Sequence, residues 1–249
     1  SHMVYRSSNP ALNPQYFQGG VASERMTLDG TINKTLALLG LVSIAAMLSY
    51  SIILQNPAYF GLLFWGGFAG GVVFWLTIMF MRPQNPQILM SIYALLEGLF
   101  IGAFSFGIEG YYLGGTEGVI LQALVGTVAV FLTMLVVYKF GLIKPTKKFV
   151  LVVVSMAGAI MIVYMFNLVL SLFGTTVPFL HSSGPIGIGI SVVFLTVAAL
   201  FLIIDFAMIE NGVKYGAPKN MEWYGAFGLV LTLVWLYLEM LKLIAKLRD

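Results

Sequence analysis

Seven long apolar runs constrain this chain of 249 residues more than any other feature. Each run is bounded by charges, prolines or polar clusters, and each approaches the ~20 residues that a helix needs to cross a hydrocarbon core. Hydrophobic residues make up 59% of the chain and charged residues only 9%. The sequence therefore predicts an all-α polytopic membrane protein. We expect its seven transmembrane helices at 33–54, 59–81, 87–108, 118–138, 149–173, 186–209 and 223–245.

The connections between these runs are too short to hold a second domain, so residues 33–249 are expected to form one seven-helix membrane domain. Residues 1–32 are polar and rich in Pro, Asn, Gln and Gly, which is typical of a flexible N-terminal tail. The opening residues 1–3, Ser-His-Met, look like a scar from tag cleavage and are set aside.

Basic residues alternate between the two ends of the predicted helices. The first, third and fifth loops contain no lysine or arginine, whereas the tail and the even loops do. The positive-inside rule then predicts a multi-pass protein of the bacterial inner membrane with a cytoplasmic N-terminus. The residues that carry this prediction are Arg6, Arg25, Lys34, Arg82, Lys139, Lys144, Lys147, Lys148, Lys214 and Lys219. Three basic residues after the middle of the last run argue against it: Lys242, Lys246 and Arg248.

Composition also excludes several kinds of chemistry. The chain has no cysteine and two histidines, so it cannot supply the ligands of a membrane zinc hydrolase. It has no GxSxG motif. A net charge of +3, dispersed along the chain, does not suggest nucleic acid as a partner. We expect no enzymatic activity and no cofactor.

Three acids lie inside the apolar runs: Glu97, Asp205 and Glu239. An ionisable residue within a membrane is costly and therefore a functional hypothesis by default. Asp205 has no basic residue one helical turn away, whereas Lys242 follows Glu239 by three residues, which leaves a plain ion pair open for Glu239. Glu97 precedes the GxxxG pair Gly98/Gly102, so we expect it to face the bundle, either lining a cation route or packing in a neutral form.

The remaining polar residues and the small residues have simpler interpretations. Acids at the ends of the runs, Glu222 among them, and His181 in the fifth loop are interpreted as solvated groups. The GxxxG pairs in GGFAGG at 66–71 and at Gly98/Gly102 favour packing within one chain over dimerisation, so a monomer is expected.

Carboxylates without histidine or cysteine hold protons and hard cations well. Ca²⁺ prefers oxygen ligands, and two nearby carboxylates titrate as a coupled pair. A site of that kind would respond to pH and to cations together.

Three segments carry a family resemblance: YALLEGLFIGAFS in the third run, LFLIIDF in the sixth and LYLEMLKLIAKL in the last. Over about residues 33 to 247 they resemble the Bax inhibitor-1 family (transmembrane BAX inhibitor motif proteins), in its bacterial branch. The resemblance implies a last helix surrounded by the other six. It also implies a pair of acids, one on each of the last two helices, that forms a pH-sensitive latch for calcium leak.

Carried onto this sequence, the resemblance assigns the latch, and any bound Ca²⁺, to Asp205 and Glu239, the second of which stands where the family has aspartate. Arg82 and Lys242 become the basic members of the gate. The chain departs from the family in its long sixth loop. Helix arithmetic lets the two acids meet only if residues 223–228 stay near the surface, which Gly225 and Gly228 would allow.

The sequence therefore predicts a pH-sensitive calcium or cation leak channel or exchanger, whose partners are the lipid bilayer, Ca²⁺ and protons. The alternative is a membrane regulator that transports nothing and binds a membrane protease or a stress-response protein through its basic fourth loop. Calcium would be a transported or weakly bound ion.

Overall fold

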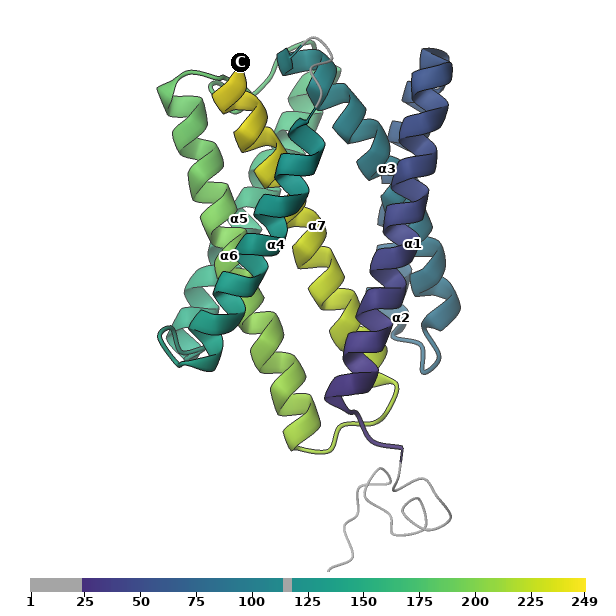
Figure 1. Cartoon of the computed structure of the whole chain (residues 1–249), viewed down its shortest axis with the longest axis vertical. Coiled ribbons are helices and arrows are strands. Elements are labelled where there is room, and N and C mark those ends of the chain that lie inside the picture. Colours follow the sequence, from purple (N-terminus) through teal and green to yellow (C-terminus); the bar gives the residue numbers. More distant parts are fainter. Residues whose placement is uncertain (1–23, 114–117) are drawn as a thin grey trace, which may run out of the picture.

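The computed structural model describes residues 24–113 and 118–249, so most of the tail predicted for residues 1–32 lies outside it. Its described part contains seven helices that are long and apolar enough to cross a membrane, which confirms the predicted fold class (Figure 1). The helices are α1 (Leu28–Gln55), α2 (Phe60–Met81), α3 (Gln87–Leu113), α4 (Val119–Lys139), α5 (Lys147–Leu172), α6 (Pro185–Lys214) and α7 (Met221–Arg248), with a 3₁₀ turn, η4 (Pro57–Tyr59), before α2.

The helix ends follow local capping chemistry. α1 begins at Leu28, earlier than the predicted residue 33, because the Thr27 hydroxyl accepts a hydrogen bond from the backbone N–H of Gly30. The first turn also carries Asp29, which suits the positive end of the helix dipole. α2 ends at Arg82, whose φ of 42° is left-handed and which precedes a proline that cannot continue the helix.

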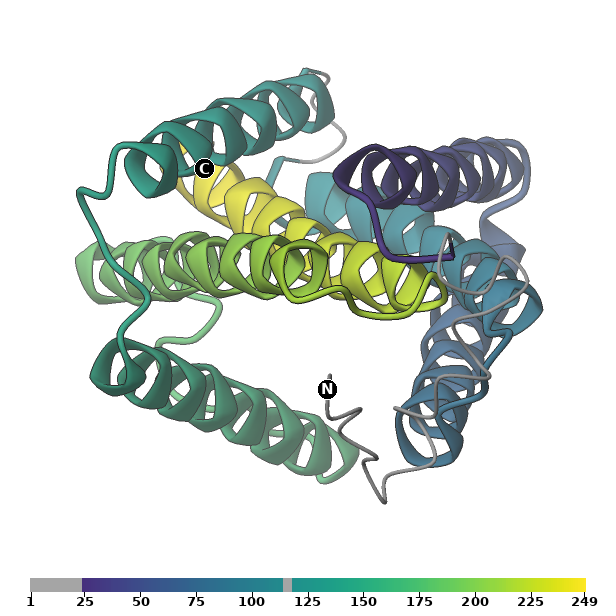
Figure 2. The ribbon, with the colours of Figure 1, turned by 90° about the horizontal axis from the view of Figure 1, so that it is seen from below.

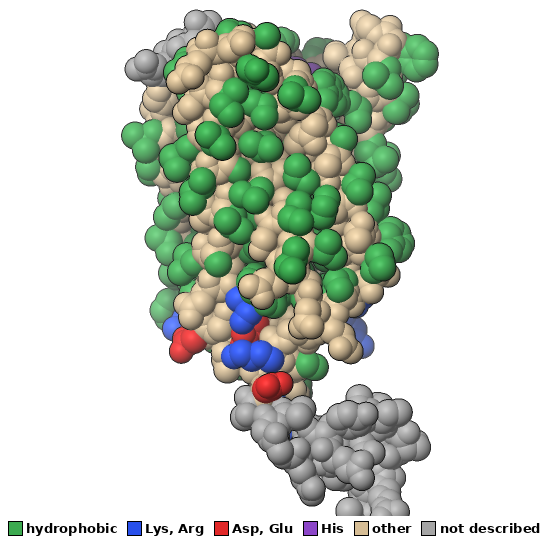
Figure 3. Space-filling model, turned by 90° about the vertical axis from the view of Figure 1, so that its right-hand side faces the viewer, with side chains coloured by type: hydrophobic (Ala, Val, Ile, Leu, Met, Phe, Trp, Pro, Cys, Tyr) green, Lys and Arg blue, Asp and Glu red, His purple; other side chains and the backbone are tan. Residues whose placement is uncertain are grey.

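The two ends of the bundle differ in charge. We call the end that carries the start of α1 and the α2–α3, α4–α5 and α6–α7 connections the basic end, and the opposite one the far end. Figure 3 shows charged side chains gathered at the basic end of one face, with hydrophobic side chains over the rest. This separation of charge from apolar surface is what a membrane-spanning orientation requires.

The last helix is central, as predicted. α7 packs against α1, α3, α4 and α6, and its buried side chains occur on all sides of the helix (Figure 2). Its packing on the other six helices is uneven: α2 lies mainly against α3 and α5 mainly against α6. α5 reaches α7 through side chains such as Tyr164.

Glycines bring α1, α2 and α3 close together. A β-carbon at Gly98 or Gly102 would collide with backbone carbonyls of α1, and one at Gly67 would lie 2.7 Å from the backbone nitrogen of Phe100. The GxxxG pair at Gly98/Gly102 therefore packs within the chain, as the sequence favoured.

Candidate functional site

Asp205 is buried on α6 at a point where α7 comes close. Its Oδ1 would lie 3.8 Å from a β-carbon built at Gly228, and the carboxylate faces Thr232 one turn further along α7. The Thr232 hydroxyl donates at 3.1 Å to the carbonyl of Gly228. Oδ2 of Asp205 is buried and has no hydrogen-bond partner among the described residues. One carboxylate oxygen is therefore unsatisfied by the described part of the protein.

Glu239 lies in a second polar cluster, between α5 and α7. Its side chain is 2% exposed, and its Oε1 accepts hydrogen bonds from the Tyr164 hydroxyl and, at 3.3 Å, from Nε1 of Trp235. Nζ of Lys242 donates at 3.2 Å to the Tyr164 oxygen and lies 4.8 Å from the centre of the Tyr164 ring. Oε2 of Glu239 is buried without a partner in the described part of the chain. The cluster is a chain of hydrogen bonds in which Lys242 donates to Tyr164 and Tyr164 donates to Glu239.

The structure does not bring the two acids together. Asp205 lies beside Gly228, and Glu239 stands eleven residues further along one continuous helix, about 16 Å away along the axis. The predicted hydrogen-bonded pair and its shared cation are therefore wrong for this structure. The reason is that α7 begins at Met221 and runs unbroken through Gly225 and Gly228, where the pairing needed a break.

The predicted basic members of the gate are also placed apart. Arg82 is exposed at the end of α2, its guanidinium carbon 5.9 Å from the ring centre of Tyr224, and it forms no ion pair with either acid within the described residues. Lys242 approaches Glu239 only through the bridging hydroxyl of Tyr164. The plain ion pair considered for Glu239 is thus replaced by a tyrosine-bridged one.

Glu97 occupies a third environment, between α2 and α3. Its Oε2 accepts a hydrogen bond at 3.2 Å from the Tyr93 hydroxyl and would lie 3.4 Å from a β-carbon at Gly71. Nothing in this arrangement connects it to Asp205 or Glu239. Its place on a cation route stays a prediction.

One buried acid was missed by the sequence interpretation. Glu222, expected to be solvated, is 0% exposed and receives four hydrogen bonds. Its Oε2 accepts from the backbone N–H of Thr27 at 2.7 Å, from the Thr27 hydroxyl at 2.9 Å and from Nζ of Lys219 at 3.2 Å, and its Oε1 accepts from Nζ of Lys34 at 2.6 Å. A local signal was present, because Lys219 precedes Glu222 by three residues.

Main-chain bonds extend this cluster, which we call the Glu222 clasp (Thr27, Lys34, Lys219 and Glu222). The N–H of Met26 donates to the carbonyl of Ala217 at 2.8 Å, and the N–H of Lys219 donates to the carbonyl of Glu24 at 3.0 Å. Gly30 lies against the carboxylate so closely that a β-carbon there would collide with it. The clasp therefore ties the start of α1 to the α6–α7 connection.

A second lysine of α7 is buried near the far end. Nζ of Lys246 donates to the carbonyls of Leu180 and Gly187 and to the hydroxyl of Ser191, at 2.7, 3.1 and 2.8 Å. Its charge is therefore held inside the protein and does not count as a loop charge against the predicted orientation. His181 beside it is not simply solvated: its Nε2 lies 3.3 Å from Nδ2 of Asn167.

Burial, and then the neighbouring Lys242 and Lys246, lower the pKa of His181 to about 4. The ring is therefore neutral at physiological pH. Because the Asn167 amide nitrogen can only donate, Nε2 of His181 acts as the acceptor and its proton is assigned to Nδ1.

No group of three or more His, Asp or Glu side chains suited to a metal lies within residues 24–113 and 118–249. Comparison with known proteins gives one match, to the family model described as Bax inhibitor 1 like, over residues 9–249. No curated protein and no solved structure shows a significant match to the chain.

Proposed function

The chain belongs to the Bax inhibitor 1 like family, and from that premise we propose that it is a pH-sensitive cation leak channel or exchanger, with calcium as the favoured ion. The proposal places it in the bacterial inner membrane with the basic end in the cytoplasm, following the distribution of lysine and arginine. Membership of this family fits either a channel or a regulator, and the feature that favours transport lies in the interior of the bundle.

The observation that carries the proposal is the pair of buried carboxylate oxygens without protein partners, Oδ2 of Asp205 and Oε2 of Glu239. An unsatisfied polar atom in a low-dielectric interior is expensive, and such atoms in native proteins usually serve a ligand, an ion or a proton. Carboxylate oxygens are the ligands that calcium prefers.

Asp205 on α6 and Glu239 on α7 lie at different depths in the bundle. Asp205 is nine residues, or about 13 Å, from the end of α6 at the basic end, and Glu239 is nine residues from the end of α7 at the far end. We therefore place them as two successive stations for a cation or a proton, in contrast to the single latch that the resemblance implied. A proton and a cation compete for the same oxygens, so flux should fall as the carboxylates take up protons.

Calcium flux into proteoliposomes, measured between pH 5.5 and 8.5, tests the proposal. Asp205→Asn and Glu239→Gln should each lower the flux and flatten its dependence on pH, because each removes one titrating station. Asp29→Asn and Glu210→Gln are matched controls, since both replace exposed acids and should leave the flux unchanged. Wild-type flux and pH profile in both station variants would overturn the proposal.

The regulator remains the second candidate, because the four lysines of the α4–α5 region are all exposed: Lys139, Lys144, Lys147 and Lys148. A basic surface at one end of a membrane protein suits an acidic protein partner. The flux experiment separates the two candidates, since a protein that only docks a partner would transport no calcium at any pH.

A further inference from the structure

A long groove opens between α1 and α4, which do not pack against each other. Its volume is about 2290 Å³, and along α1 it extends from Leu28 to Leu54, about 39 Å at ~1.5 Å per residue. This length exceeds the ~30 Å thickness of a hydrocarbon core, so the groove crosses the membrane from one side to the other.

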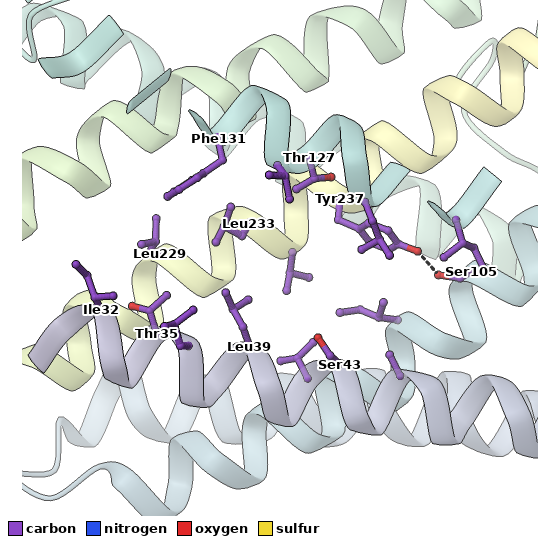
Figure 4. Close-up of a pocket in the computed structure, with 18 of the residues that line it drawn as sticks. Ile32, Thr35, Leu39, Ser43, Ser105, Thr127, Phe131, Leu229, Leu233 and Tyr237 are labelled. Atoms are coloured by element: carbon purple, nitrogen blue, oxygen red, sulfur yellow. Dashed lines mark hydrogen bonds between the residues drawn. The ribbon is translucent and has the colours of Figure 1, made fainter. Parts of the chain in front are cut away.

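The walls of the groove are apolar and its floor is α7. Figure 4 shows side chains of α1 and α4 facing each other across it, with α7 behind: Ile32, Thr35, Leu39 and Ser43 on α1, Thr127 and Phe131 on α4, and Leu229, Leu233 and Tyr237 on α7. Several of the hydroxyls in the groove bond within the protein: Thr127 donates to the carbonyl of Ala123 at 2.6 Å, and Tyr237 pairs with Ser105 at 2.8 Å. At membrane depth a surface of this kind is covered by acyl chains, because water gains no partners there.

The basic end of the groove is positively charged. Lys139 at the end of α4 and Lys214 at the end of α6 both line it and are both exposed. Nζ of Lys214 also lies 5.5 Å from the ring centre of Tyr215. The acid at this mouth, Glu210, accepts a hydrogen bond from the Tyr138 hydroxyl at 2.8 Å and pairs with neither lysine. Two cations against one acid at the level of the headgroups favour an anionic group there.

We propose that the groove between α1 and α4 is a binding site for one anionic phospholipid of the leaflet at the basic end. Its phosphate lies between Lys139 and Lys214, and its acyl chains lie along α7 in place of a helix-to-helix contact. The site requires no cation transport and stands independently of the function proposed above.

Lipid binding to the purified protein, measured by native mass spectrometry, tests the headgroup. One molecule of phosphatidylglycerol per chain should bind more tightly than phosphatidylcholine. The double variant Lys139→Gln/Lys214→Gln should weaken phosphatidylglycerol binding about thirtyfold, at ~1 kcal/mol per lysine. The control Lys144→Gln/Lys148→Gln removes the same charge from the neighbouring loop, outside the groove, and should weaken it by less than threefold. Equal loss in both pairs, or no preference between the two lipids, overturns the anionic headgroup.

A pair of valines on α4 tests the location. Val128 lines the groove and is 57% exposed, whereas Val125 is 62% exposed and lies outside it. Val128→Trp should fill the groove and displace the lipid, and Val125→Trp should not. Both replace exposed side chains, so both variants should fold. Equal lipid binding in the two variants overturns the site, and so does a purified dimer in which the groove of each chain is covered by α4 or α1 of the other.

Discussion

Glu222 at the start of α7 and Asp205 beside α7 are both buried carboxylates, but they differ in their hydrogen bonding. Glu222 receives four hydrogen bonds, two of them from lysines, whereas Asp205 has an oxygen with no partner in the described structure. A buried charge that is fully paired holds a fold in one arrangement. A buried acid with an unpaired oxygen can still bind a proton or a cation reversibly. Glu222 therefore suits a structural role, whereas Asp205 suits a role in the proposed transport.

The largest expected effect in this comparison comes from Glu222→Gln. Removing the charge weakens the four hydrogen bonds that the carboxylate accepts, while Lys34 and Lys219 stay partly exposed, so we expect a loss of about 2 kcal/mol in the free energy of unfolding. Thermal unfolding in detergent measures it. Glu210→Gln, an exposed acid that accepts one hydrogen bond from Tyr138, should change stability by less than about 0.5 kcal/mol. Equal melting temperatures for the wild type and Glu222→Gln would show that the clasp contributes no stability.

A smaller loss is expected from Gly30→Ala. The new β-carbon would collide with the Glu222 carboxylate, which four hydrogen bonds hold in place, so the cost should be about 1–2 kcal/mol. Gly40→Ala is the matched control on the same helix. Nothing lies within 4 Å of a β-carbon there, so alanine should be neutral or stabilise by up to about 1 kcal/mol through its helix propensity. If Gly30→Ala is as stable as Gly40→Ala, the close fit at Gly30 does not affect the free energy of unfolding.

Asp205→Asn should change stability by less than about 1 kcal/mol, because the Asp205 carboxylate has no ion-pair partner in the described structure. Glu239→Gln should cost about 1 kcal/mol, because glutamine can still accept from Tyr164 and Trp235 but leaves the buried Lys242 without a nearby negative charge. Because the two acids are about 16 Å apart along α7, their effects on stability should add to within about 0.5 kcal/mol in the double variant. A coupling energy of 1 kcal/mol or more in this double-mutant cycle would restore the direct pair that the structure does not form.

The smallest effect concerns His181, whose neutral form is favoured. Its pKa of about 4 lies below the ~6.5 of an unfolded histidine, so its contribution to stability is complete above pH 6.5 and is lost as the pH falls toward 4. Amide hydrogen exchange in residues 173–184 should therefore speed up over that interval beyond the intrinsic change, and His181→Gln should abolish the extra acceleration. An unchanged profile in the variant would assign the loosening to another group.

The fold could be predicted from the sequence because hydrophobic runs of membrane-spanning length leave few alternatives. All seven helices were expected, and the larger errors are at α1 and at the ends of α3 and α6. α1 starts early because Thr27 caps it, and the apolar pattern alone does not register a cap. α6 runs on to Lys214, although those residues leave the apolar run, because Glu210–Lys214 contains no proline and Gly212 packs against Met26.

The candidate site was harder to predict, since it depends on how helices align along their axes. The three acids within spans were identified, but the choice of Glu239 as the partner of Asp205 rested on resemblance and required a break in α7. Glycine permits such a break without requiring it, and α7 runs unbroken through Gly228. Two of the three residues that bind Glu222, Lys34 and Thr27, lie 188 and 195 positions away, a separation that local patterns do not connect.

The glycine contacts between α1 and α3 have a mechanical consequence. Two helices that touch backbone to backbone at Gly98 and Gly102 have no side-chain layer to deform between them, so they move as one stiff unit, with α2 carried along on α3. α7 packs closely on α6, and the Glu222 clasp ties the start of α1 to the α6–α7 connection. We therefore expect bending of the bundle to concentrate at the groove between α1 and α4, where no close helix packing resists it, so that a change in bilayer thickness alters the width of that groove.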